Sequence, residues 1–420
     1  MFKILKNKEA FTVLQYKEFV NFLVARFFVT IAVQMQTVVI SWQVYEYSKD
    51  PLALGMIGIS EVIPFFITSI FSGHISDNYN RKKIIIYATI GLIGITLGQL
   101  YFSVNNQVFQ SSGLLPLYIL TGFSGIVRGF FASAFMPLMI QLVPRKIFAV
   151  ATTWNSTVWH TAVIVGPSLA GLLCVLSFTV AYSVSLVFVI VTIISMLFIS
   201  SYPVPKKEKK EPLRDSLLGG IKFVLNNRII LNVMLLDFLV VLFGGAIAML
   251  PVFADKIYGV GTSELGIMTS MPALGAIVTA VIMAFKPPVN AGKNMLLSVF
   301  CFSLVTICFA LNTNYFFGLF LLFLIGVFDN VIVVVRHTIV QLSTPDDMQG
   351  RVAAVGSIIN GSSVEISSFE SGLTTRLFGL VPAIFLGGGV TLLVTIIAYF
   401  SMPNLKKINI HAINVNNAEA

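Results

Sequence analysis

The sequence predicts an all-α membrane protein with twelve transmembrane helices in two six-helix halves. Composition is the first indication, because 56% of the 420 residues are hydrophobic, only 11% are charged and the mean hydropathy is +0.90. A soluble protein needs a more polar surface than this. The second indication is a series of long apolar runs. The third is one long polar segment near the middle, which separates six runs from six.

Each apolar run is long enough to cross a bilayer as a helix. At about 1.5 Å per residue, roughly 20 residues cover the hydrocarbon layer. Polar residues blur the ends of the fourth, fifth, tenth and eleventh runs. The expected spans are residues 19–45, 52–76, 83–104, 114–141, 151–175, 178–201, 229–252, 262–285, 294–312, 315–341, 353–374 and 378–402.

The polar segment sets the predicted domain boundaries. The expected domains are an N-terminal half at 1–201, a cytoplasmic linker at 202–228, and a C-terminal half with a cytoplasmic tail at 229–420. Inside the linker, apolar residues recur at every fourth position, at Leu213, Leu217, Ile221 and Leu225. This spacing predicts an amphipathic helix lying on the cytoplasmic leaflet. The alternative is a solvated connection with no further role.

Short internal similarities indicate that the two halves are repeats. "PLALGMIG" (51–58) aligns with "TSELGIMT" (262–269), and "LMIQLVP" (138–144) aligns with "TIVQLSTP" (338–345). Both matches fall at corresponding spans of a six-plus-six arrangement. A parallel duplication explains them most simply.

The basic residues are distributed asymmetrically about the spans. Of the 27 lysines and arginines, 21 lie at the termini and in alternate connections, three lie on the opposite side and three lie within spans. Cytoplasmic loops carry such an excess, so both termini are expected in the cytoplasm. The net charge of +9 therefore reflects orientation and indicates no nucleic-acid partner.

The turn after the second span contains a charged motif. It reads "GHISDNYNRKKI" from Gly73, with Asp77 closing the span and Arg81 opening a basic triplet. This pattern resembles the loop motif of the major facilitator superfamily. Asn78 stands where the motif often has a basic residue, and Asn80 replaces its second glycine. Asn tolerates left-handed backbone well, so the second departure is mild.

Other segments resemble a bacterial exporter branch of that superfamily, which includes enterobactin exporters and, more distantly, macrolide efflux pumps. They are "SWQVYEYSKDPLALGMIGISEVIPF" (41–65), "LLDFLVVLFGGAIAMLPVFA" (235–254), "TPDDMQGRVAAV" (344–355) and "FESGL" (369–373). The resemblance implies a monomeric transporter of the bacterial inner membrane that works by alternating access. Its expected substrate is a siderophore; the alternative is multidrug or macrolide efflux by proton antiport.

The resemblance also implies gating residues. Asp77 and Arg81 would latch the cytoplasmic side, while the alternative is that the turn only anchors the topology. "VGPSLAG" in the fifth span is similar to the Gly-Pro motif of the superfamily's antiporters, although Ala170 takes one glycine place. Gly166 and Pro167 are therefore expected to take part in gating.

Eight charged residues fall within spans, where each costs about 2.5–3.5 kcal/mol on insertion scales and so needs a reason. Five lie on the spans that line the central cavity in the superfamily: Arg26 and Arg128 in the N-terminal half, and Asp237, Asp329 and Arg336 in the C-terminal half. The repeat offsets map Arg26 onto Asp237, and Arg128 onto the residue before Asp329. The eight are Arg26, Glu61, Arg128, Asp237, Asp329, Arg336, Glu365 and Glu370.

We expect these opposite charges to pair across the cavity, to bind substrate or to exchange a proton. A carboxylate favours its neutral form when desolvated and its charged form beside a guanidinium, so separating such a pair drives proton uptake. Asp237, Asp329 and Glu370 are the expected proton-coupling residues. The alternative for Arg26 and Asp237 is a static structural pair.

The first span has a polar and aromatic side. Gln34 and Trp42, with Gln36 and Gln43, would suit a large amphipathic ligand. The expected substrate-binding residues are Arg26, Gln34, Trp42, Arg128, Asp237 and Asp329. Trp42 has an alternative role as an anchor at the membrane interface.

Catalytic and cofactor motifs are absent from the sequence. It contains no His-Glu-x-x-His, Cys-x-x-Cys, Gly-x-Ser-x-Gly or Gly-x4-Gly-Lys-Ser/Thr, and no histidines with metal-ligand spacing. We expect no enzyme activity, cofactor or metal, with a membrane enzyme as a remote alternative. The expected partners are a small-molecule substrate, protons and the lipid bilayer, with the proton gradient as the energy source.

Overall fold

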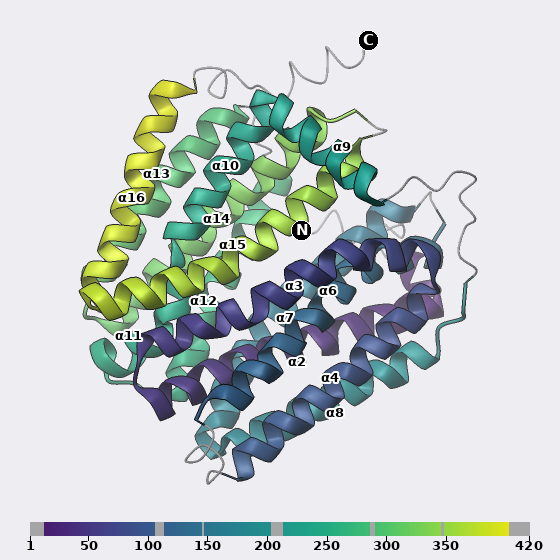
Figure 1. Cartoon of the computed structure of the whole chain (residues 1–420), viewed down its shortest axis with the longest axis horizontal. Helices are drawn as coiled ribbons and strands as arrows, with labels where there is room; N and C mark the ends of the chain where they lie inside the picture. The colour runs from purple at the N-terminus through teal and green to yellow at the C-terminus, as the bar shows by residue number, and fades with distance from the viewer. Residues whose placement is uncertain are drawn as a thin grey trace. The chain divides into compact units, whose positions relative to one another are not determined.

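The computed structural model of the chain describes residues 12–105, 113–144, 147–202, 213–285, 290–345 and 348–402. The regular structure of this part is helical, without strands (Figure 1). Residues 203–212 of the predicted linker and residues 403–420 of the predicted tail lie outside the described residues. The positions predicted for those two segments therefore stay predictions.

Long helices account for the predicted spans. In the N-terminal half they are α2 (Lys17–Ser48), α3 (Pro51–Asn78), α4 (Arg81–Val104), α6 (Leu115–Leu142), α7 (Phe148–Leu176) and α8 (Phe178–Leu197). In the C-terminal half they are α10 (Arg228–Phe243), α12 (Thr262–Phe285), α13 (Ala291–Leu311), α14 (Tyr315–Leu342), α15 (Gln349–Phe378) and α16 (Leu380–Ser401). The shorter helices are η1 (Thr12–Gln15), α9 (Leu213–Asn226), η3 (Gly245–Met249), α11 (Leu250–Phe253) and η4 (Ala254–Tyr258).

Eleven helical segments of the described chain are long and apolar enough to cross a membrane. The segment from α10 through η4 counts as one of them. Helix α15 matches the remaining predicted span and has 30 residues, but serines, glycines, Glu365 and Glu370 lower its hydropathy. The structure therefore agrees with the twelve-helix prediction, with α15 as the most polar member.

The seventh span is not a continuous α-helix, contrary to the sequence prediction. Helix α10 ends at Phe243, and the chain continues through Gly244 into the 3-10 helix η3, α11 and the π-helix η4. Consecutive glycines lower helix propensity, and Pro251 lacks an N–H and is tolerated because it opens α11. An irregular stretch at membrane depth needs protein around it. Gly245 lies directly over Ser367 of α15.

The chain divides into two compact units. One contains the described residues of Met1–Tyr47, Ser60–Glu208 and Gly261–Ser270, and the other contains those of Ser48–Ile59, Lys209–Val260 and Met271–Ala420. Each unit therefore holds most of one predicted half together with the first turns of one helix from the other half.

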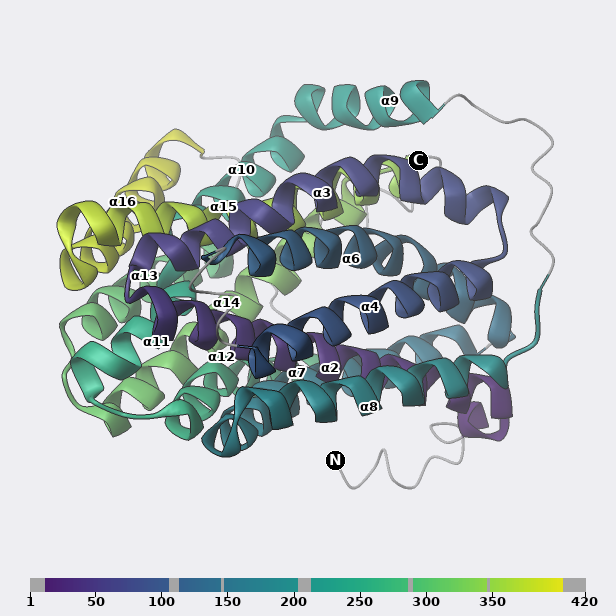
Figure 2. The same cartoon turned by 60° about the horizontal axis from the view of Figure 1, so that its bottom comes forward.

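The first unit has a core of buried apolar side chains from α2, α4, α6 and α8. Phe19 and Phe22 of α2, Leu92 of α4, Phe135 of α6 and Val189 of α8 belong to one cluster. Helix α4 packs against α6 and α8 and lies between them in Figure 2. These contacts hold the polar side chains of α2 at fixed positions.

In the second unit, α13 packs against α14 and α16, and the predicted linker helix is present as α9. Val224 of α9 is buried with Met234 and Val352, from α10 and α15. The predicted apolar face points elsewhere, because Ile221 and Leu225 are 42% and 59% exposed. Helix α9 thus packs on protein at Val224 and leaves Ile221 and Leu225 exposed. Its contact with the membrane stays a prediction.

Candidate functional site

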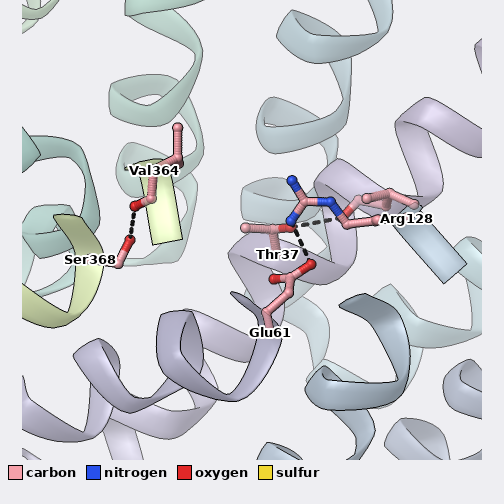
Figure 3. A network of polar contacts seen from close by, with 6 residues as sticks. Thr37, Glu61, Arg128, Val364 and Ser368 are labelled. Carbon is pink, nitrogen blue, oxygen red and sulfur yellow. Dashed lines mark hydrogen bonds and ion pairs between the residues drawn. The ribbon is translucent and has the colours of Figure 1, made fainter. Parts of the chain in front are cut away.

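Arg128 forms an ion pair inside the N-terminal half. Its Nη1 atom lies 2.5 Å from Oε1 of Glu61 on α3, and the two side chains point toward one another beside Thr37 of α2 (Figure 3). The guanidinium also lies 6.0 Å from the centre of the Phe65 ring. The Arg128 side chain is 36% exposed and that of Glu61 is 10% exposed. Part of this cation is therefore accessible to a ligand.

A close approach of α3 and α6 brings this pair together. Gly125 of α6 lies against the backbone carbonyl of Glu61, so closely that a Cβ there would overlap it. Small residues permit such helix contacts in membranes, where packing replaces the hydrophobic effect as the driving force. Arg128 lies three residues after Gly125, on the same side of α6, and so faces α3.

Arg26 of α2 is held differently. Its guanidinium carbon lies 4.5 Å from the centre of the Phe135 ring, an arrangement that stabilises a cation by about 0.5–2 kcal/mol. Its Nε atom is buried and has no hydrogen-bond partner among the described residues. A buried N–H without an acceptor is costly, so Arg26 has capacity left for an anionic ligand.

Asp237, Arg336 and Asn360 form a polar cluster inside the C-terminal half. Arg336 Nη1 lies 3.0 Å from Oδ2 of Asp237 and also donates to Oδ1 of Asn360. Its Nη2 lies 3.3 Å from Nε2 of His337. Side chains of Asp237 and Arg336 are only 4% and 6% exposed. Helices α10, α14 and α15 each contribute to this desolvated network.

Asp329 lies near enough to this cluster for the charges of Asp237 and Arg336 to act on it. The next residue, Asn330, has a buried Nδ2 atom without a partner among the described residues. Two carboxylates and one guanidinium therefore share a region with an unsatisfied donor. Such an arrangement can accept a proton or a polar ligand group.

The opposite charges that the repeat offsets match stand at corresponding positions along their helices, and their relative depth stays a prediction. Arg26 and Asp237 each lie nine residues after the first residue of their helices, and Arg128 and Asp329 lie 13 and 14 residues after theirs. The partners observed are within each half: Glu61 for Arg128 and Arg336 for Asp237. Pairing of Arg26 with Asp237 across the two halves stays a prediction.

Two glutamines on the polar side of α2 bond to neighbouring helices. Gln36 donates to Thr96 and Ser185 at 2.9 Å, and Gln43 accepts from the Tyr182 hydroxyl at 2.9 Å. Both glutamine side chains therefore form hydrogen bonds that connect helices inside the first unit. They are seven residues apart and share one helix face.

Gln34 and Trp42, which with Arg26 are the predicted substrate-binding residues of α2, lie apart from that buried face. Gln34 is half-buried beside Gly166, and Trp42 is half-buried against Tyr45, with ring centres 6.3 Å apart. Neither side chain takes part in the hydrogen bonds of Gln36 and Gln43 with Thr96, Ser185 and Tyr182. Their role in binding stays a prediction.

The charged turn is bonded to neighbouring helix ends. Arg81 donates from Nε to the Ser76 carbonyl at 3.3 Å and from Nη1 to the Pro137 carbonyl at 3.5 Å. Asn80 caps the start of α4 by accepting from the Lys83 N–H at 3.2 Å. Asp77 lies in the last turn of α3, and the structure does not describe its side chain. The latch role of Asp77 and Arg81 is therefore untested, whereas Arg81 does tie three helix ends together.

The remaining predicted residues lie at helix contacts. An added Cβ at Gly166 would lie 2.7 Å from Cβ of Gln34, so α7 and α2 touch at this glycine. Pro167 follows it inside α7, where it removes one backbone N–H. Glu370 of α15 is half-buried beside Ser371. Their proposed gating and proton-coupling roles stay predictions.

Comparison with known proteins identifies the family. The sequence profile of the Major Facilitator Superfamily matches residues 22–368. The chain belongs to the major facilitator superfamily. This confirms the expected resemblance and the major facilitator fold, and it makes the protein a transporter and not an enzyme.

Curated relatives in the superfamily lie in the expected branch. The enterobactin exporter EntS of Escherichia coli O1:K1 / APEC is 27% identical over 297 residues, which cover 68% of each protein. That of Shigella boydii serotype 4 (strain Sb227) is 26% identical over 310 residues, which cover 71% of each protein. The chain is therefore similar to named siderophore exporters over about two thirds of their length.

Solved major facilitator structures share the fold. A bacterial homologue of the human lysosomal transporter Spinster, described as inward-facing and unoccupied, has a TM-score of 0.69 and 15% identity, covering 93% of this chain and 98% of its own. A POT family transporter in complex with 5-aminolevulinic acid has a TM-score of 0.73 and 12% identity, covering 93% and 96%. At this identity they establish the fold alone.

The sequence prediction of the transporter site omitted Glu61, Arg336 and Asn360. Glu61 and Arg336 were recognised as charges within spans, yet neither was assigned to the site. One feature of the sequence could have indicated these partners: the spans of each half contain both acidic and basic residues, so an ion pair can form within one half. Asn360 offered no such signal, because a neutral amide in a span is not exceptional.

Proposed function

We propose that this transporter exports a siderophore from the cytoplasm across the bacterial inner membrane in exchange for protons. The observation that carries the proposal is the similarity to enterobactin exporters over 68–71% of each chain. The charges within the spans agree with it. Siderophores bind iron through carboxylates or catecholates, and guanidinium groups recognise such anionic oxygens with charge-assisted hydrogen bonds.

Two arginines of the N-terminal half are suited to bind an acidic chelator. Arg128 is one-third exposed while paired with Glu61, so a ligand carboxylate can compete with Glu61 for its guanidinium group. Arg26 has a buried Nε without a partner among the described residues. A ligand that bound both arginines would replace Glu61 as the acidic partner of Arg128 and would accept a hydrogen bond from Nε of Arg26.

The C-terminal half is suited to carry the proton. Asp237 is desolvated and depends on Arg336 for its charged form. When the two separate, the carboxyl group takes up a proton, and it releases the proton when the pair forms again. Asp329 and Glu370 are the other carboxyl groups proposed for this transfer.

Drug or macrolide efflux by proton antiport is the second candidate. It is favoured by Asp329, whose carboxyl group makes no hydrogen bond recorded among the described residues, although the Arg336 charge acts on it. A cationic drug would use this carboxylate, since opposite charges attract strongly where water is scarce. The two candidates therefore depend on residues of opposite sign.

Deletion of the gene under iron starvation tests the proposal. Low-molecular-weight iron chelator is measured by mass spectrometry in culture supernatant and in cells. The expected result is loss of the chelator outside and accumulation inside, restored by the wild-type gene. Unchanged chelator in both compartments would overturn siderophore export and direct the work to drug susceptibility.

Charge-neutralising variants separate the two candidates. Arg26→Gln and Arg128→Gln are expected to abolish chelator export, whereas Asp329→Asn is expected to affect a cationic drug more strongly. Lys49→Gln is the matched control, because Lys49 pairs with Asp255 at 3.6 Å in an exposed position. A transporter that depends on the aspartate and not on either arginine would contradict the siderophore assignment.

A further inference from the structure

An apolar groove runs between α4 and α6 of the first unit. Its volume is about 640 Å³, and residues lining it include Tyr87, Gly91, Gly94, Leu120, Phe123 and Phe130. Apart from the Tyr87 hydroxyl, the lining side chains are apolar. Tyr87 is 69% exposed and Phe123 is 53% exposed, so the groove opens to the outside of the unit. In a membrane-spanning helix that side meets lipid.

The groove is shaped by glycines, and a lysine precedes its lining residues on α4. Lys83, Tyr87, Gly91 and Gly94 are spaced by four, four and three residues, which places them along one face of α4. An added Cβ at Gly94 would meet nothing within 4 Å. The face thus begins with a basic side chain, continues with an aromatic ring and ends in open space.

Lys83 differs from its basic neighbours. Arg81 bonds to the Ser76 and Pro137 carbonyls, and Lys82 bonds to the Leu197 carbonyl at 3.2 Å and to the Ile199 carbonyl. The Lys83 side chain is exposed one turn before Tyr87. It can therefore contact a ligand that occupies the groove.

The length of the groove fits one leaflet. Its lining extends along α4 from Ile84 to Ile95 and along α6 from Leu120 to Phe130. At 1.5 Å per residue these stretches are about 15–17 Å long. Half of the hydrocarbon layer is about 15 Å thick. An extended acyl chain whose headgroup lies at the Lys83 end matches this length better than a compact molecule does.

We propose that the α4–α6 groove is a binding site for a phospholipid of the leaflet at the Lys83 end, with an acyl chain in the groove and an acidic headgroup at Lys83. The positive-inside distribution of charge makes this the cytoplasmic leaflet. Acidic lipids are attracted to basic residues at that surface, and a tyrosine at headgroup level suits the boundary between chain and head. The proposal does not depend on what the transporter exports.

Lipid retention on the purified full-length protein tests the site. Protein extracted in detergent and washed extensively is analysed by native mass spectrometry, after reconstitution with either an acidic or a zwitterionic phospholipid of the same chains. Wild-type protein is expected to retain the acidic lipid preferentially. Lys83→Gln is expected to lower this preference by about fivefold, the effect of one basic residue at an anionic surface.

A second variant tests the site by filling the groove with a side chain. Gly94→Leu places a side chain in open space and is expected to fold normally while losing retention of both lipids. Gly389→Leu in α16 is the matched control, because an added Cβ there also meets nothing within 4 Å. Lys293→Gln is the control for charge, since Lys293 is an exposed lysine at the third position of α13.

Three outcomes would overturn the proposal. One is equal retention of acidic and zwitterionic lipid by wild-type protein. Another is unchanged retention in Gly94→Leu or an unchanged headgroup preference in Lys83→Gln. The third is that the control variants lose lipid as much as the groove variants do, which would show that any lipid loss is unspecific.

Discussion

Removing one partner of the Asp237–Arg336 ion pair is expected to destabilise the protein more than removing both. The two side chains are 4% and 6% exposed and 3.0 Å apart, so each charge relies on the other for the solvation it has lost. In Asp237→Asn, the guanidinium keeps its contacts with Asn360 and His337 and the charge of Asp329 nearby, but it loses its direct counter-ion. A buried charge left without its counter-ion costs about 3–5 kcal/mol.

Arg336→Gln has the converse effect: the Asp237 carboxylate loses its counter-ion and is left near a second carboxylate, that of Asp329. The cost is expected to be in the same range, partly offset because Asp237 can accept a proton and become neutral. In the double variant Asp237→Asn with Arg336→Gln, both positions are neutral amides that can bond to one another. Its loss of stability is therefore expected to be smaller than that of either single variant.

The assay is thermal unfolding of the purified protein in detergent at one fixed scan rate, since membrane proteins of this size often unfold irreversibly. The exposed pair of Lys49 and Asp255 supplies a matched control, with side chains 55% and 39% exposed. Removing either of those partners is expected to cost about 0.2–1 kcal/mol. The contrast between the two pairs isolates the effect of burial.

Transport measured on the same variants separates stability from function. If Asp237 carries the proton, the double variant unfolds close to the wild-type temperature and still fails to export against a proton gradient. A double variant less stable than both single variants would refute the electrostatic reasoning. Full coupled export by Asp237→Asn would refute the carrier role.

Three further predictions concern other contacts. Arg128→Gln removes charge-assisted bonds worth about 1.5–3 kcal/mol and should lower export of an acidic chelator at least tenfold in inverted vesicles, whereas Glu61→Gln should retain export. An added Cβ at Gly326 would overlap the Pro272 carbonyl, so Gly326→Leu should cost about 1–3 kcal/mol and reduce the monodisperse yield; normal yield would contradict it. Lys82→Met removes the bonds to the carbonyl of Leu197, the last residue of α8, and to that of Ile199 just after it. It should lower the unfolding temperature slightly, by the equivalent of about 0.3–1 kcal/mol, with export preserved.

Helix count and helix length were predictable because the bilayer imposes them. A run of about 20 apolar residues has few alternatives to a helix where backbone groups cannot bond to water. Helix α15 is the member with the weakest signal, since Glu365, Glu370 and many small polar residues dilute its hydropathy. Its serines lie against Gly245 of the broken seventh span, a tertiary contact that hydropathy cannot reveal.

The break in the seventh span had a local signal. Gly244, Gly245 and Pro251 are weak helix formers within a few residues of each other, and the structure places the change from α-helix to 3-10 helix at the glycines. The length of the apolar run concealed it. Residue propensity and hydropathy disagreed at this point, and hydropathy alone does not describe backbone geometry.

Partner choice among the charged residues could not be predicted from spacing. Glu61 and Arg128 are 67 residues apart and meet because Gly125 lets α3 and α6 approach. Arg26 and Asp237 lie at the same distance in sequence from the starts of their helices, but this correspondence does not specify which helix faces which. The pairs seen within each half depend on rotation of each helix about its axis, which packing determines.

The positions of the two ion pairs indicate which carboxylate takes up a proton when substrate binds. Each pair lies within one compact unit, so its separation requires a competing ligand or a rearrangement inside that unit. An acidic chelator that takes Arg128 from Glu61 leaves a poorly solvated carboxylate, which should take up a proton. That proton would travel with the substrate and cannot drive antiport.

The carrier for exchange is then left to the C-terminal half, at Asp237 or Asp329. Proton release or uptake on adding ligand to the protein in weakly buffered solution checks this argument. A chelator should cause net uptake that disappears in Glu61→Gln, whereas a cationic drug bound at Asp329 should cause release. Uptake that persists in Glu61→Gln would place the responding carboxylate elsewhere, and the division of work between the two halves would be wrong.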